Sequence, residues 1–169
     1  SGHMNALISM DGKYYECEAG YGGTAPRLYT IKERTSLFSY RSLKNGIEVY
    51  QYDVEDINLI TSVTVPDSID GKVVTSIGDE FVSYSKNLTT VKFPDTVTNI
   101  GRIAFFSCPK LKTLTITANV ETIGRNAFAN CNQLTDLTID SKNRHFVMKG
   151  GVIYNFNITE CYGGPTVKS

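Results

Sequence analysis

The chain has 169 residues, of which 41% are hydrophobic and 20% are charged, and its formal net charge at pH 7 is zero. A neutral chain has no overall field that attracts nucleic acid or an acidic membrane surface, so neither is an expected partner. No apolar run approaches the ~20 residues that a membrane-spanning helix requires, so this segment is not expected to insert into a membrane. Residues 1–4, Ser-Gly-His-Met, are interpreted as a cloning scar.

Residues 5–58 are predicted to form an N-terminal β-hairpin region or cap. Asp11-Gly12 is typical of two-residue hairpin turns, because both residues tolerate a positive φ. A second hairpin is predicted for residues 37–43 and 47–52, which flank the turn sequence Lys44-Asn45-Gly46. Tyr, Phe, Thr, Val and Ile are frequent throughout, and these residue types favour strands.

The centre of the chain is a tandem repeat. Residues 88–110 (LTTVKFPDTVTNIGRIAFFSCPK) are followed without a gap by residues 111–133 (LKTLTITANVETIGRNAFANCNQ), and nine of the 23 positions are identical. A related unit starts at Ile60 and carries five extra residues at 70–74, and a further unit starts at Leu134. Each unit is too small to bury its apolar face alone, so consecutive units are expected to stack into a solenoid.

The apolar positions of each unit predict how the solenoid is built. The fourth and sixth positions point to the same side of an extended chain, which predicts a short strand with one buried face. The tenth and thirteenth positions are also predicted to point inward, and the Ala-Phe pair that follows is expected to fill the coil. Gly101 and Gly124 are expected to permit a tight bend. One shared polar position is expected to hydrogen-bond local backbone groups at a corner, and its first occupants are Ser68, Thr96 and Asn119.

Two of the four cysteines belong to the repeat. Cys108 and Cys131 are 23 residues apart and occupy the same place in their units. Parallel side chains on stacked coils hold the two Cβ atoms too far apart for easy disulfide closure. These cysteines are therefore predicted to be buried thiols that act as small hydrophobic side chains. The sequence leaves open whether Cys17 and Cys161 are paired.

The repeat pattern resembles that of a known family. Residues 111–119 contain L-x-x-L-x-I-x-x-N, which resembles a leucine-rich repeat. The longer motifs F-P-D-T-V-T-N-I-G at 93–101 and I-G-R-x-A-F-x-x-C at 100–108 and 123–131 are similar to the BspA-like leucine-rich repeats of bacterial surface proteins. The resemblance covers roughly residues 57–164.

This resemblance implies a mainly β fold: a short right-handed leucine-rich-repeat solenoid with a parallel sheet, flanked by β-hairpin caps. Residues 59–144 are predicted to form the solenoid, and residues 145–169 a C-terminal hairpin cap and tail. The resemblance also implies a cell-surface or secreted protein that binds a partner through the exposed face of the repeat sheet. Threonine is also simply a residue type that exposed strands favour. The predicted binding residues are Ser62, Thr64, Thr90, Lys92, Thr113, Thr115, Asp136 and Thr138.

Catalytic groups are scarce. His145 is the only histidine beyond the cloning scar, and a Cys161–His145 pair is the one nucleophile–base arrangement that we consider. A partly exposed loop histidine is the favoured interpretation. A Cys/His metal site needs three or four convergent ligands, a requirement that these few residues do not meet in sequence. The sequence therefore predicts no enzyme activity, no catalytic residue, no metal and no cofactor.

The leading hypothesis is a non-enzymatic binding or adhesion module that contacts a protein or a glycan. Two alternatives stay open. One is a structural spacer within a longer repeat protein, and a loose likeness between residues 8–24 and 147–164 favours the view that the chain is a segment of such a protein. The other, a remote alternative, is a Cys-dependent hydrolase or transferase.

Overall fold

The computed structural model describes residues 5–10, 13–19, 29–34, 36–54, 56–155 and 161–163, with side chains in 36–54 and 56–155. The described residues form strands and turns, and no helix is present among them. The strands are β1 (Asn5–Met10), β2 (Lys13–Ala19), β3 (Tyr29–Arg34), β4 (Phe38–Leu43), β5 (Gly46–Tyr52), β6 (Ser62–Thr64), β7 (Ser68–Ile69), β8 (Lys72–Ile77), β9 (Thr90–Lys92), β10 (Asn99–Ile100), β11 (Thr113–Ile116), β12 (Thr122–Ile123), β13 (Asp136–Ile139), β14 (Phe146–Lys149), β15 (Val152–Asn155) and β16 (Cys161–Gly163).

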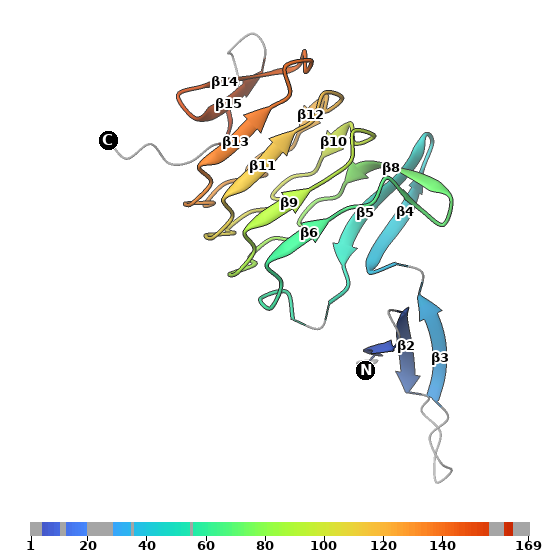
Figure 1. The fold of residues 1–169 in the computed structure, drawn as a ribbon. Coiled ribbons are helices and arrows are strands. Elements are labelled where there is room, and N and C mark those ends of the chain that lie inside the picture. Colours follow the sequence, from blue (N-terminus) through green and yellow to red (C-terminus); the bar gives the residue numbers. More distant parts are fainter. Residues whose placement is uncertain are drawn as a thin grey trace.

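Two sheets form the body of the solenoid (Figure 1). The front sheet has the order β13-β11-β9-β6, and all its strands are parallel. The back sheet has the order β12-β10-β8-β5-β4, in which only β4 is antiparallel to its neighbour. Equivalent residues of successive units pair, as Asn99 does with Thr122, so the stacked coils and the parallel sheet predicted from the repeat are confirmed.

A third side of each coil is held by hydrogen bonds between loops rather than by regular strands. Alternate backbone amides of one loop donate to carbonyl oxygens of the next loop, namely Ile103 to Arg125 at 3.1 Å, Phe105 to Ala127 at 2.8 Å and Ser107 to Ala129 at 2.8 Å. These loops contain residues with positive φ in the same two places of each unit: Glu80 and Tyr84, Ile103 and Ser107, Asn126 and Asn130. The left-handed conformation costs a residue other than glycine about 1–2 kcal/mol, and the hydrogen bonds between coils offset this local strain.

The core lies between these sides and consists of the residues that the repeat pattern marks as inward. Val97, Ile100, Val120 and Ile123 are all buried, as are the Ala-Phe pairs of both units. The phenyl rings of Phe105 and Phe128 stack with centroids 5.7 Å apart. Such ring pairs add ~1 kcal/mol to the burial of their area, so the core is continuous from coil to coil.

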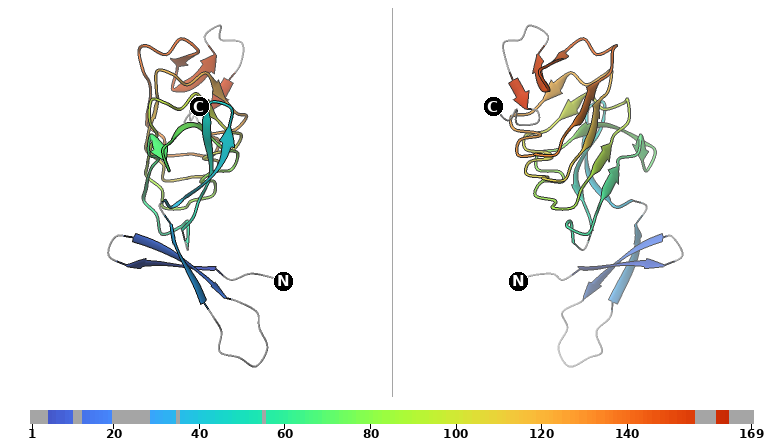
Figure 2. Two further views of the ribbon diagram at one scale, coloured as in Figure 1. Left: turned by 90° about the vertical axis from the view of Figure 1, so that its right-hand side faces the viewer. Right: turned by 60° about the vertical axis from the view of Figure 1, so that its left-hand side comes forward.

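Hairpins lie at both ends of the stack (Figure 2). At the N-terminal end β4 and β5 form the predicted antiparallel hairpin, and β5 also pairs in parallel with β8. At the other end β14 and β15 pair across Gly150 and Gly151, which both have positive φ. β1, β2 and β3 form a separate antiparallel sheet, although the turn residues Asp11-Gly12 lie outside the described residues.

The insertion at 70–74 produces a hairpin arm, residues 68–73, that sequence reasoning missed, while Val74 is buried and pairs with Ile47 in the back sheet. β7 pairs antiparallel with the first part of β8, and Asp70 and Gly71 make the turn with φ of 52° and 73°. An Asp-Gly pair is the signal that predicted the hairpin at residues 11–12, and the same signal was present here.

The predicted reason for Gly101 and Gly124 was wrong. Neither residue has a positive φ, so neither needs the conformational freedom of glycine for a bend. A Cβ on Gly101 would instead overlap the backbone of Gly78 and Asp79, and a Cβ on Gly124 would overlap the backbone of Gly101 and Arg102. These glycines are required because successive coils approach too closely for any side chain.

The shared corner position also differs from its prediction. Ser68 donates to the carboxylate of Asp67 at 3.0 Å instead of to the backbone, and Thr96 Oγ1 is buried without a hydrogen bond among the described residues. Only Asn119 bonds a backbone carbonyl, that of Asp95 at 2.8 Å, which belongs to the preceding coil. The position therefore has no common bonding role.

Replacement of Gly101 by alanine is expected to lower the free energy of unfolding by more than about 2 kcal/mol, because the added methyl group meets backbone that cannot move aside. Gly71→Ala is the matched control, since a Cβ there meets nothing within 4 Å and only the positive φ is unfavourable. That control is expected to lose about 1 kcal/mol in urea unfolding. Equal losses in the two variants would contradict the close-packing explanation.

Replacement of Asn126 by valine is expected to lower the free energy of unfolding by about 1–2 kcal/mol, because a β-branched residue is poorly suited to its φ of 58°. The side chain of Asn126 is exposed, so little packing changes. Asn126→Gly serves as the control and is expected to stay within about 0.5 kcal/mol of the parent. A valine variant as stable as the glycine variant in urea unfolding would argue against strain at this position.

Candidate functional site

The front sheet presents one buried and one exposed set of side chains. In β11, Leu114 and Ile116 point into the core with no exposed surface, while Thr113 and Thr115 are exposed. The same alternation holds across the sheet. Of the eight predicted binding residues, Thr90 is half-buried and seven are exposed, namely Ser62, Thr64, Lys92, Thr113, Thr115, Asp136 and Thr138. We call these eight side chains the front face.

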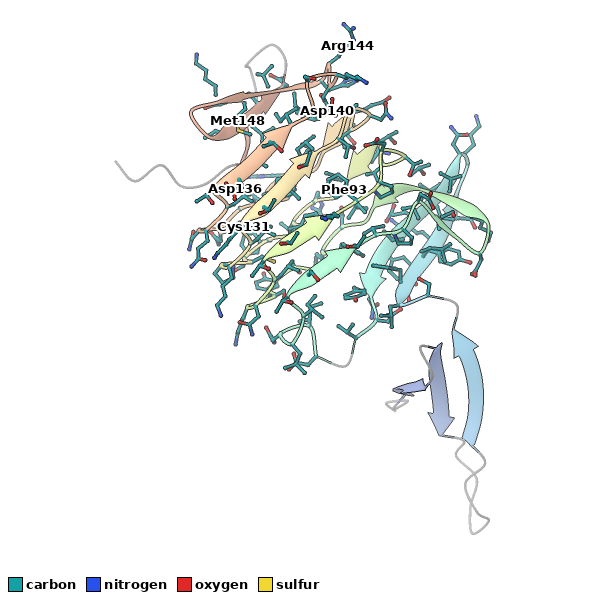
Figure 3. The ribbon with its side chains drawn as sticks, in the orientation of Figure 1. Phe93, Cys131, Asp136, Asp140, Arg144 and Met148 are labelled. Atoms are coloured by element: carbon teal, nitrogen blue, oxygen red, sulfur yellow. The ribbon has the colours of Figure 1, made fainter. Side chains whose placement is uncertain are left out.

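The front face is ordered in two columns that cross the strands. Thr113 pairs with Thr90 on one side and with Asp136 on the other, where Asp136 marks the end of its column (Figure 3). Thr115 pairs with Thr138, and their hydroxyl oxygens are 3.0 Å apart. Neighbouring strands are about 4.8 Å apart, so the hydroxyl groups recur at short and regular intervals along the solenoid axis.

Two charged side chains interrupt the hydroxyl groups of the front face. Lys92 lies on β9 and Asp136 on β13, and both are exposed. Neither forms an ion pair with any residue that the structure describes. One cation and one anion are therefore available to a partner, together with hydroxyl groups that can both donate and accept hydrogen bonds.

The residues considered for catalysis are not brought together in the described part of the chain. His145 is exposed, and its backbone amide donates to Asn143 Oδ1 at 2.8 Å. The side chain of Cys161 lies outside the described residues, as do those of Cys17 and the scar. Within the described ranges, no three His, Cys, Asp or Glu side chains converge as metal ligands. No helix in these ranges is long and apolar enough to cross a membrane.

Cys108 and Cys131 are free and buried, as predicted. The Sγ of Cys108 lies 3.2 Å from the carbonyl oxygen of Val82, and the Sγ of Cys131 lies 3.1 Å from that of Phe105. The neighbouring Cys131 thiol and burial together raise the pKa of the Cys108 thiol. Ser85, at the equivalent place one coil earlier, likewise donates to a carbonyl, that of Ile57 at 2.9 Å. The side chain at this position of each unit therefore contacts a backbone carbonyl of the preceding coil inside the core.

Stacked coils of about 23 residues, each with a short parallel strand and a buried L-x-x-L-x-I side, define a leucine-rich-repeat solenoid. The sequence model described as "BspA type Leucine rich repeat region" matches residues 47–169 in six copies. The chain therefore belongs to the BspA-type leucine-rich-repeat family. The match includes β5, which the structure places in the back sheet beside β8.

Three solved structures are similar to parts of this chain. A leucine rich cell surface protein from Faecalibacterium prausnitzii A2-165 is 34% identical over 58% of this chain, with a TM-score of 0.51, and the match spans only 24% of that longer protein. A leucine rich repeat protein of T. pallidum is 19% identical, with 60% of this chain and 68% of that chain covered and a TM-score of 0.36. The pneumococcal vaccine antigen PcpA is 15% identical, and the match covers 98% of this chain and 57% of that chain with a TM-score of 0.41. No curated protein matches the chain.

The buried thiols are expected to resist alkylation in the folded protein. At a pH near the ordinary thiol pKa of about 8.5, iodoacetamide should modify Cys108 and Cys131 at least about a hundredfold more slowly than an exposed thiol, because burial blocks access and the raised pKa keeps Cys108 protonated. Peptide mass mapping measures each site.

A Thr113→Cys variant provides the exposed reference thiol on the front sheet. Both buried cysteines should react readily once the chain is unfolded in urea. Alkylation of Cys108 in the folded protein at the rate of the reference thiol would contradict the buried position.

Proposed function

We propose that this chain is a non-enzymatic binding module of a cell-surface or secreted protein, and that it contacts a protein or glycan partner through the front face. The observation that carries the proposal is the exposure of seven of the eight predicted side chains on one side of a continuous parallel sheet. Membership of a repeat family supports it, because repeat solenoids commonly use extended sheet surfaces for binding.

The chemistry of the front face suits an extended partner. Its small hydroxyl side chains lose little conformational entropy on binding, and each can donate and accept hydrogen bonds. Thr90 and Thr113 are the same residue in successive units, whereas Lys92 is replaced by Thr115 and Asp136 takes the place of Thr113 in the last unit. The positions that change from copy to copy are the ones we assign to partner selection.

A surface location is part of this proposal. The relative from F. prausnitzii is described as a leucine rich cell surface protein and shares 34% identity with this chain. A module that projects from a cell meets partners by diffusion, and the opposite charges of Lys92 and Asp136 would orient such a partner across the strands.

One observation favours a structural spacer as the second candidate. The chain matches 24% of the longer relative, as one segment within a larger repeat array would. In that case the front face would carry no partner of its own. The two functions differ in whether front-face substitutions change binding.

Replacement of Thr90, Lys92, Thr113 and Thr115 together by alanine is expected to weaken capture of the partner, because these residues form the centre of the front face. A glycan array and a pull-down with candidate surface proteins measure the wild type and the variant side by side. A loss of at least about tenfold in affinity is expected from several removed hydrogen bonds.

A matched control carries four exposed alanine substitutions away from the front face, at Lys86, Glu121, Asn132 and Gln133. This control should bind like the wild type, and unchanged unfolding curves would show that both variants are folded. If the front-face variant binds a captured partner as well as the control does, the front face is not the contact site and the spacer interpretation is favoured.

A further inference from the structure

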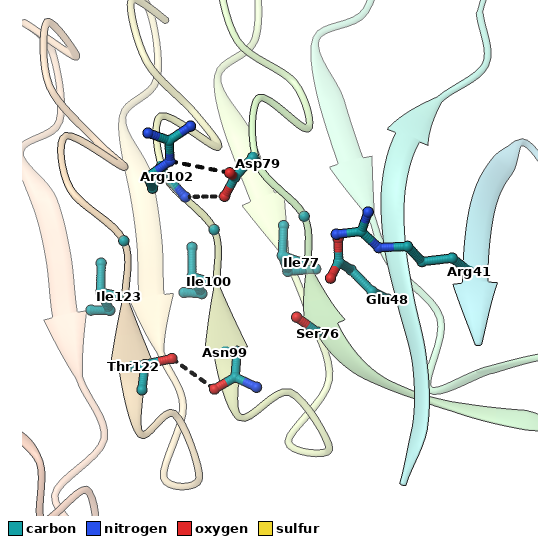
Figure 4. Close-up of a pocket in the computed structure, with 13 residues that line it drawn as sticks. Arg41, Glu48, Ser76, Ile77, Asp79, Asn99, Ile100, Arg102, Thr122 and Ile123 are labelled. Carbon is teal, nitrogen blue, oxygen red and sulfur yellow. Dashed lines mark hydrogen bonds and ion pairs between the residues drawn. The ribbon is translucent and has the colours of Figure 1, made fainter. Parts of the chain in front are cut away.

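The outer side of the back sheet contains a concave site that is separate from the front face. A groove of about 270 Å³ crosses three coils there (Figure 4). Its lining comes from β4, β5, β8, β10 and β12 and from the glycine that follows each of the last three strands. The volume is close to the lower end of the range of small-molecule sites, about 300 Å³.

The groove exists because side chains are forbidden along its middle. Close stacking of the coils excludes a Cβ at Gly101 and Gly124, and a Cβ on Gly78 would lie 2.8 Å from Glu48 Oε1. Gly78, Gly101 and Gly124 form a row along the middle of the groove, and side chains project outward only on the two sides of this row. One side is formed by Ser76, Asn99 and Thr122, and the other by Asp79 and Arg102 (Figure 4).

Hydrogen-bonding groups in the groove are left without partners. Ser76 is only 6% exposed, and its hydroxyl makes no hydrogen bond with any residue that the structure describes. Asn99 Oδ1 accepts from Thr122 Oγ1 at 2.7 Å, while Asn99 Nδ2 has no partner among the described residues. The Ser76 oxygen is reached by solvent, so a ligand hydroxyl can replace water there without breaking a hydrogen bond within the protein.

The charges of the groove are balanced. Arg41 pairs with Glu48 at 2.6 Å, and Arg102 Nε pairs with Asp79 Oδ2 at 3.2 Å. The backbone amide of Arg102 also donates to Asp79 Oδ1, and this bond, followed by the guanidinium group, lowers the pKa of the Asp79 carboxyl. Two cations and two anions give no net attraction for an ion, so the lining favours a neutral ligand whose groups both donate and accept.

An aromatic side chain stands beside this polar lining. Tyr50 follows Glu48 by two residues on β5, so both point to the outer side of the back sheet. The Tyr50 side chain is 41% exposed, and its Cβ lies 2.8 Å from the position of a Cβ on Gly78. Tyr50 does not line the groove itself, but its exposed side chain begins beside Gly78, where it can contact the apolar face of a ligand that extends beyond the lining.

We propose that this groove binds a short, neutral oligosaccharide that lies along the solenoid axis. Sugar hydroxyls donate and accept hydrogen bonds, as the unpartnered Ser76 and Asn99 groups and the flanking ion pairs require. A pyranose ring also has an apolar face that Tyr50 can cover. Three coils about 4.8 Å apart span roughly 10 Å, which is enough for two or three sugar units. The proposal is independent of the front face.

The test is a titration of the full ¹⁵N-labelled chain with neutral trisaccharides (cellotriose, chitotriose and mannotriose), followed by NMR. At least one sugar, added up to about 10 mM, should shift the amide signals of Gly78, Asn99 and Gly101. A titration to this concentration detects binding with a dissociation constant in the millimolar range. The amide signals of Asn132 and Gln133, which lie outside the groove lining and the front face, should not move. Trigalacturonic acid and an unrelated soluble peptide are tested in parallel.

Two substitutions distinguish binding from folding. Ser76→Ala removes a hydroxyl that has no partner in the protein, and Asn99→Asp removes two N–H donors but keeps the oxygen that Thr122 bonds. Each should weaken the sugar by about fivefold or more with an otherwise unchanged spectrum. Gln133→Ala, at an exposed position outside both the groove lining and the front face, should bind normally.

The proposal is overturned by any of three results. Groove amides could remain unshifted with every neutral trisaccharide, they could respond only to trigalacturonic acid or to the peptide, or both groove variants could bind the sugar as tightly as the wild type. Binding of a partner to the front face has no bearing on these outcomes, because it is read from different amide signals.

Discussion

Hydrogen bonds between the backbones of successive coils are the constraint on which this structure depends. On the back side, Gly101 donates to Ile77 at 2.8 Å and Gly124 donates to Ile100 at 2.7 Å, so each coil continues the ladder of the one before. On the loop side the direction reverses, because residues such as Ile103 donate forward to the next coil. A coil bonded on all sides cannot change its length freely, and the insertion at 70–74 is accommodated only as an outward hairpin arm.

The same constraint produces the surfaces on which function can act. Coils separated by one strand spacing bring equivalent side chains into columns, which turns single threonines into the front face. It also forbids a Cβ at Gly101 and Gly124, and the missing side chains leave the groove on the opposite sheet. One face is therefore a nearly continuous layer of short side chains, and the other is hollowed along a line of glycines.

Much of the fold was accessible from the sequence, and the reason is the repeat itself. Inward positions such as Leu114 and Val120 recur with the same spacing, and their burial follows from the periodicity alone. The conformation of the loop side could not be predicted from the sequence. The positive φ of Ile103 is imposed by hydrogen bonds to the next coil, and isoleucine as a residue type disfavours it. The front-face residues could be named in advance because alternation places them, whereas the groove depends on glycines whose role is visible only when coils are stacked.

The pattern of sequence change between copies separates scaffold from recognition. Residues that fill the core or permit close stacking, such as Phe105 and Phe128 or Gly101 and Gly124, are identical in the two units. Polar side chains beside the glycines of the groove differ, since Asn99 is replaced by Thr122 one coil later. A substitution at such a position leaves the core packing between coils unchanged and alters at most a surface hydrogen bond, such as the one from Thr122 to Asn99, so its cost in stability is small and its effect on a bound partner is direct. Stability therefore restricts the buried positions of the repeat and leaves both outer surfaces free to vary, which is the property that a repeat module needs in order to acquire different ligands on an unchanged frame.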